Sequence, residues 1–111
     1  MNTSSIHLIR LATVCALAAT LGFSAMAQQT ATQLHARATA AMCANCHGTD
    51  GRTTEGSAIP SLVGMPKDYM VLQLKGFKDG SRPATVMHQI TKGLTDAQID
   101  TISSYYAATK R

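Results

Sequence analysis

The stretch Cys43-Ala44-Asn45-Cys46-His47-Gly48 holds two cysteines three positions apart, followed at once by a histidine. Residues at this spacing lie on the same side of a helix, about one turn apart. Two such thiols can bond to the two vinyl-derived carbons of one porphyrin, and the adjacent imidazole then falls beneath the iron. A C-x-x-C-H run is therefore typical of covalent haem c attachment. It predicts thioether bonds from Cys43 and Cys46 and an iron bond from His47.

Three other interpretations of the two cysteines deserve comparison. A thioredoxin-like dithiol would lie near a βαβ pattern, whereas these cysteines follow a helical stretch. A zinc site would need a second ligand pair at finger-like spacing, and the sequence has no second cysteine pair. A structural disulfide between Cys43 and Cys46 stays open, because thiols oxidise in an exporting compartment. Haem attachment is favoured because it also accounts for His47.

The first 27 residues have the pattern of a secretory signal peptide. An apolar run from Leu11 to Phe23 is followed by Ala25-Met26-Ala27, a small-residue cleavage pattern. The run is too short to span a bilayer, so we expect removal of residues 1–27 and no membrane attachment afterwards. The mature domain is then 28–111, in the periplasm. Cys15 leaves with the signal peptide.

The size and charge of the chain indicate which classes of macromolecule it could bind. With 111 residues and a formal net charge of +4, it is small and mildly basic. The basic residues are scattered and form no run of the kind that binds nucleic acid, although an acidic protein surface is a suitable partner. A domain this small buries little apolar surface. A covalently held haem would supply much of its core.

The hydrophobic pattern predicts an all-α domain, because no stretch shows sustained period-2 alternation. The expected helices span 33–46, about 67–77 and 84–91, and a last helix follows Thr95. This last helix opens with the capping box Thr95-Asp96-Ala97-Gln98. Its apolar face follows at helical spacing and consists of Ile99, Ile102 and Tyr106.

The iron needs a second axial ligand on the face opposite His47. The candidates in the mature chain are Met42, Met65, Met70, Met87, His35 and His88. Met87 is favoured, because it precedes the final helix at a point where the chain can return over the second haem face. Met65 and Met70 are lesser candidates with an alternative role as core residues. His88 is expected on the surface or beside the haem propionates, with bis-His ligation as a minor alternative.

Pairing His47 with a methionine raises the iron potential and leaves no open position for a substrate, which favours electron transfer. A peroxidase or sensor with an open iron position is the alternative from another class. The second ring nitrogen of His47 also needs a partner, usually a carbonyl. The apolar loop around Pro60 could supply one.

With these residues in place, the chain resembles a small monohaem class I cytochrome c. The resemblance rests on the haem motif, the Pro60 loop, Met87 and the end of the last helix at Ser104-Tyr105-Tyr106-Ala107. It implies N- and C-terminal helices that cross near the haem edge and one haem c. It further implies axial ligation by His47 and Met87, and a Pro60 carbonyl that accepts a hydrogen bond from His47.

Within that family, three segments resemble the cytochrome subunit of flavocytochrome c sulfide dehydrogenase: Ile59-Pro60-Ser61-Leu62, Gln73 to Gly80, and Arg82 to Met87. This resemblance implies a flavoprotein (FAD) partner that oxidises sulfide and passes electrons to the haem. The chain would then be an electron-transfer subunit that is not catalytic alone. A free periplasmic cytochrome that serves an oxidase or reductase remains the alternative, because such carriers share much of these segments.

Overall fold

The structure, a computed structural model, describes residues 28 and 30–110, and the predicted signal peptide lies outside them. The chain divides into two compact units, Met1–Leu34 and His35–Arg111. The described residues of the first unit are helical, and there the Thr32 hydroxyl donates a hydrogen bond of 2.9 Å to the Gln28 carbonyl. The second unit contains every residue of the predicted haem site.

The second unit begins with a helix over residues 35–47, which ends within the cysteine motif as predicted. Its alanines are strong helix formers, and their small side chains let another helix approach closely. Ala40 is completely buried. The carbonyl of Ala40 accepts a hydrogen bond of 2.8 Å from the hydroxyl of Tyr106, near the far end of the sequence.

A single 3₁₀ turn, η1 (Thr49–Gly51), follows this helix. Within it Asp50 adopts the left-handed conformation, with φ 52° and ψ 28°, which aspartate tolerates better than most residues. The Asp50 carboxylate accepts a hydrogen bond of 2.9 Å from the Tyr105 hydroxyl. The turn is thereby tied to the last helix before the chain enters the loop that contains Pro60.

Helix α2 (Lys67–Asp79) starts directly after Pro66 and ends at Gly80, which has a left-handed φ of 84°. Glycine suits this terminal position because it has no Cβ to clash there. Met70 and Leu74, one turn apart, form the buried face of the helix. The pattern predicted this helix correctly but ended it near residue 77, two residues early.

Two further helices complete the unit, α3 (Val86–Lys92) and α4 (Asp96–Ala108). The start of α3 lies two residues after the predicted one. The capping box of α4 is confirmed: the Thr95 hydroxyl accepts from the Gln98 N–H at 3.2 Å, and the Gln98 side chain accepts from the Thr95 N–H at 2.9 Å.

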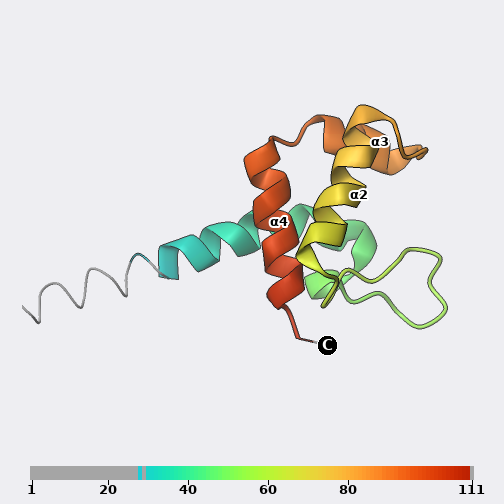
Figure 1. The fold of residues 1–111 in the computed structure, drawn as a ribbon. Coiled ribbons are helices and arrows are strands. Elements are labelled where there is room, and N and C mark those ends of the chain that lie inside the picture. Colours follow the sequence, from blue (N-terminus) through green and yellow to red (C-terminus); the bar gives the residue numbers. More distant parts are fainter. Residues whose placement is uncertain (1–27, 29, 111) are drawn as a thin grey trace, which may run out of the picture. The chain divides into compact units, whose positions relative to one another are not determined.

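The helices enclose one apolar core. Helix α2 packs against both α3 and α4, and Figure 1 shows α2 and α4 side by side. The buried apolar side chains are Ala40, Met70, Leu74, Leu94, Ile99, Ile102 and Tyr106. All regular structure in residues 28 and 30–110 is helical, which confirms the all-α prediction. No helix in these residues is long and apolar enough to cross a membrane.

Candidate functional site

The cysteine motif occupies the last turn of the helix over 35–47. Cys43 is half-buried against the core and Cys46 is exposed, and both are free thiols. The helix stops at Gly48, whose φ is +79°, and a Cβ there would lie only 2.0 Å from the carbonyl oxygen of Arg52. Only glycine fits this close approach. The two thiols are thus available for attachment, and no disulfide joins them.

His47 is buried, with 8% of its surface exposed, and its Nδ1 lies 2.7 Å from the carbonyl oxygen of Pro60. A carbonyl only accepts, so Nδ1 carries the proton and donates. This assignment leaves the Nε2 lone pair free, which is the atom an imidazole offers to a metal. Two free thiols and an oriented imidazole fit a covalently attached haem.

Burial changes the acid–base behaviour of Cys43 and of Tyr106 beside it. Desolvation raises the pKa of the Cys43 thiol, and the interaction with the neighbouring Tyr106 side chain only partly opposes this effect. The pKa of Tyr106 is raised as well, first by burial and then by the charge of Cys43. At neutral pH both groups are therefore uncharged, as suits a position against an apolar ring.

The methionines considered as second axial ligands occupy different environments. Met87 is half-buried on α3 and packs against the core. Met65 is also half-buried, in the loop before α2. Met70 lies in the core with 2% of its surface exposed, and Met42 is half-exposed on the helix of the motif. Met65 and Met87 thus share an intermediate burial, whereas Met42 is more exposed and Met70 more buried.

The segment that carries Met87 is held in place by its two neighbours in the helix. The Nδ1–H of His88 donates to the carbonyl of Phe77, near the end of α2, at 2.8 Å. The buried Thr91 hydroxyl donates to the Met87 carbonyl at 2.8 Å. The sequence offered no sign that His88 joins α3 to α2, because its partner is a backbone carbonyl. His88 was expected on the surface or beside the haem propionates. In the structure its ring forms a hydrogen bond that joins α3 to α2.

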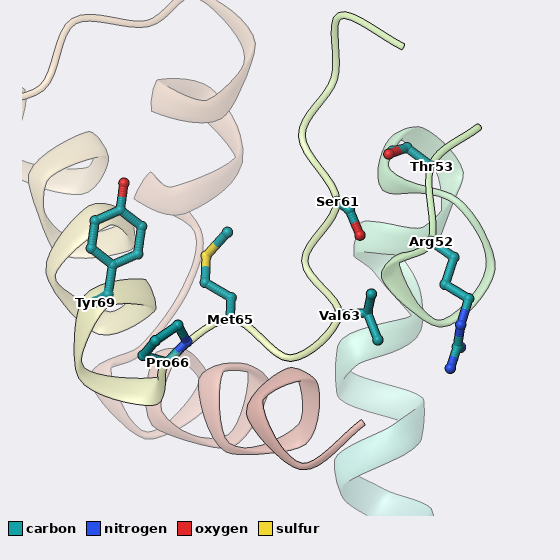
Figure 2. Close-up of a pocket in the computed structure, with 7 residues that line it drawn as sticks. All are labelled: Arg52, Thr53, Ser61, Val63, Met65, Pro66 and Tyr69. Carbon is teal, nitrogen blue, oxygen red and sulfur yellow. The ribbon is translucent and has the colours of Figure 1, made fainter. Parts of the chain in front are cut away.

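A cavity of about 640 Å³ adjoins the Pro60 loop (Figure 2). One part of its lining is apolar and includes Met65, Pro66 and Tyr69, and another part carries Arg52, Thr53 and Ser61. Its volume is within the range of ligand pockets. Cys43, Cys46, His47 and Met87 are not among the residues that line it.

The described residues contain no group of three or more His, Cys, Asp or Glu side chains that could hold a metal ion. The thiols of Cys43 and Cys46 and the imidazole of His47 do not come together as such a group.

Comparison with known proteins gives a family match over most of the second unit. The family model described as Cytochrome c matches residues 35–110. The chain is 45% identical over 64 residues to the cytochrome subunit of sulfide dehydrogenase from Chlorobaculum tepidum, an alignment that covers 58% of this chain and 56% of that protein.

Two further relatives match over larger parts of this chain. The thiosulfate dehydrogenase electron acceptor of Thiomonas intermedia is 38% identical over 71 residues, which cover 64% of this chain and 33% of that protein. Cytochrome c4 of Pseudomonas aeruginosa is 32% identical over 91 residues, which cover 82% of this chain and 45% of that protein. The alignments therefore reach only a third to somewhat more than half of these relatives' lengths.

Proposed function

Because the chain belongs to the cytochrome c family of electron-transfer proteins, we propose that it carries single electrons as the haem subunit of a periplasmic, sulfide-oxidising flavocytochrome c complex. Its all-helical fold is that of a small class I cytochrome c. Cys43 and Cys46 bind one haem c covalently. When bound, this group supplies a one-electron iron couple. The protein's residues determine how it is held, how far it is shielded from water and where electrons reach it.

One observation carries the proposal: His47 is buried directly behind two free thiols, and its Nδ1 is already engaged by the Pro60 carbonyl at 2.7 Å. The hydrogen bond fixes the ring and raises its basicity. An imidazole held in this way is a permanent ligand and would not serve as a mobile acid or base. We assign His47 as the proximal iron ligand and Pro60 as its supporting acceptor.

Met87 is the proposed second axial ligand. It lies on α3, where the Thr91 hydroxyl donates a hydrogen bond to the Met87 carbonyl. His88 joins the same helix to α2 through the Phe77 carbonyl. A soft thioether opposite an imidazole favours reduced iron and a high potential. With both axial positions filled by protein, no position remains for a substrate, which separates an electron carrier from a peroxidase or sensor.

The exposed position of Cys46 supports an electron path through the edge of the ring that bears the thioether bonds. A partner that covers this edge would bury part of the half-exposed Met42 on the same helix. The mildly basic chain would set the orientation and rate of docking more than its affinity. A dedicated subunit should bury a standard-sized interface or a larger one.

The name of the Chlorobaculum relative, a cytochrome subunit of sulfide dehydrogenase, supports a flavoprotein partner in a stable one-to-one complex. Coexpression with a flavin-containing sulfide dehydrogenase subunit from the same genome should give coelution at elevated salt, and sulfide should then reduce the haem. Reduction by sulfide with no coelution at any salt concentration would favour the alternative, a freely diffusing carrier. Failure of sulfide to reduce the haem in the mixture would refute both sulfide-linked roles.

A further inference from the structure

Two residues of the loop that carries Pro60 donate hydrogen bonds to the same backbone oxygen. The carbonyl of Gly51 accepts one hydrogen bond from the backbone N–H of Leu62 at 2.8 Å and another from the Ser61 hydroxyl at 2.9 Å. Both donors come directly after Pro60 in the chain. Figure 2 shows the Ser61 hydroxyl directed toward the segment that follows Gly51.

This acceptor is itself held rigidly. Gly51 is buried with φ +78°, and its N–H donates to the Gly48 carbonyl at 2.8 Å. A Cβ on Gly51 would lie 2.7 Å from the ring of Tyr106 and 3.0 Å from the Cβ of Leu62. The oxygen that receives Ser61 is therefore fixed against both the end of the motif helix and α4.

Anchoring at this position acts on the Pro60 carbonyl by simple geometry. The proline ring locks φ of Pro60, so ψ is the remaining soft torsion that decides where its carbonyl points. That torsion also decides where Ser61 goes. Two hydrogen bonds from Ser61 and Leu62 to one rigid oxygen hold it at the value that places the Pro60 carbonyl on His47 Nδ1.

We propose that Ser61 is a positioning residue for the proximal imidazole, acting through the Gly51 carbonyl and the Pro60 carbonyl. The inference rests on the proposed role of His47 as an iron ligand. A well-aligned acceptor on Nδ1 makes the ring a stronger electron donor and so favours oxidised iron. Loosening the acceptor weakens this donation. Loss of the Ser61 hydroxyl should therefore raise the midpoint potential.

The test uses three variants of the haem-loaded full chain. Ser61→Ala removes the hydroxyl but leaves the Leu62 bond to hold the loop, and Ser61→Thr keeps a hydroxyl. Ser57→Ala is the matched control, because it removes a serine bond in the same loop, the 3.1 Å contact with the Ile59 N–H, that does not reach Gly51. Two quantities are measured: the midpoint potential, and the exchange rate of the His47 Nδ1 proton by NMR of the reduced protein.

Ser61→Ala should raise the midpoint potential and speed the exchange of this proton by roughly two- to tenfold, as expected for the loss of one hydrogen bond. Ser61→Thr and Ser57→Ala should both resemble the parent chain. Unchanged values in Ser61→Ala, or an equal change in Ser57→Ala, would overturn the inference. The proposed function is judged separately on the parent chain, where a low-spin spectrum lost in His47→Ala shows histidine ligation whatever Ser61 does.

Discussion

The hydroxyl of Tyr106 lies 2.8 Å from the carbonyl oxygen of Ala40, and both residues are almost completely buried. This hydrogen bond joins α4 to the helix that carries the cysteine motif. The same tyrosine ring packs over Gly51, and its backbone carbonyl accepts from the Gly64 N–H at 2.9 Å. Tyr106 therefore connects three segments that position the haem site.

Tyr106→Phe should lower the free energy of unfolding by about 1 to 3 kcal/mol, because it leaves a buried carbonyl without its partner. Tyr69→Phe is the control, since Tyr69 is half-exposed and its hydroxyl makes no hydrogen bond in the described part of the chain; its effect should stay within about 0.5 kcal/mol. Urea unfolding of the two variants decides the matter. Equal losses would show that the Ala40 bond contributes nothing specific.

Substitutions at two glycines with nearly the same φ can distinguish the cost of steric overlap from the cost of a left-handed backbone. Gly51 and Gly56 have φ of +78° and +77°, but a Cβ on Gly51 would meet Tyr106 at 2.7 Å while one on Gly56 meets nothing within 4 Å. Gly56→Ala should cost about 1 to 2 kcal/mol for the left-handed backbone alone. Gly51→Ala should cost that amount and about 1 to 3 kcal/mol more for overpacking. Thermal unfolding that ranks them equally would contradict the close packing at Gly51.

Met87→Ala should abolish the sulfur-to-iron charge-transfer band at the red end of the oxidised spectrum and lower the midpoint potential, because the thioether favours reduced iron. Met65→Ala is the closest control, since Met65 is also half-buried beside the core. The band should persist in that variant. The assignment of Met87 would be wrong if Met65→Ala removed the band and Met87→Ala retained it.

The ion pair between Lys78 and Asp96 predicts a specific acid sensitivity. The Lys78 ammonium lies 3.0 Å from the Asp96 carboxylate, and this hydrogen bond lowers the pKa of Asp96. The unfolded chain then binds more protons than the native one just below the usual aspartate pKa. The stabilisation is present above about pH 4 and is lost as the pH falls through the lower native pKa.

Lys78→Gln should therefore flatten the acid limb of the stability curve, measured by urea unfolding between about pH 2 and pH 5. Lys92→Gln is a suitable control, because the Lys92 ammonium forms no ion pair within residues 30–110. An identical acid limb in the parent and in Lys78→Gln would show that the pair does not couple to folding.

The A-x-A pattern at residues 25–27 predicts cleavage after Ala27 during export. Intact-mass analysis of the exported protein should give a chain that starts at Gln28 and carries one haem. A product that retains Cys15, or that lacks the haem mass, would contradict the predicted processing or the predicted attachment.

Local signals in the sequence predicted much of the helical structure. The capping box at Thr95 and Gln98 acts within four residues, so its pattern alone was sufficient. Gly80 likewise marked the end of α2 through a conformation that glycine favours. The end of α2 and the start of α3 each lie two residues from the predicted position, because helix termini depend on contacts that periodicity does not reveal.

The contacts that shape the site were harder to predict, since they join distant residues through backbone carbonyls. Every residue carries a carbonyl, so no residue type marks the acceptors of Ser61, His88 and Tyr106. The motif indicated the atoms that hold the haem, and the proline indicated the loop that could support His47. Only the folded chain places Gly51 behind that loop.

The sequence separations of two hydrogen bonds bear on how the protein is made. His47 and Pro60 are 13 residues apart, whereas Ala40 and Tyr106 are 66 apart. Loop closure over the longer separation costs about 1.4 kcal/mol more, roughly a tenfold difference in how often each pair meets in an unfolded chain. A chain synthesised from its N-terminus also contains Pro60 before Tyr106. The ligand and its supporting carbonyl can thus meet before α4 has been made and packed.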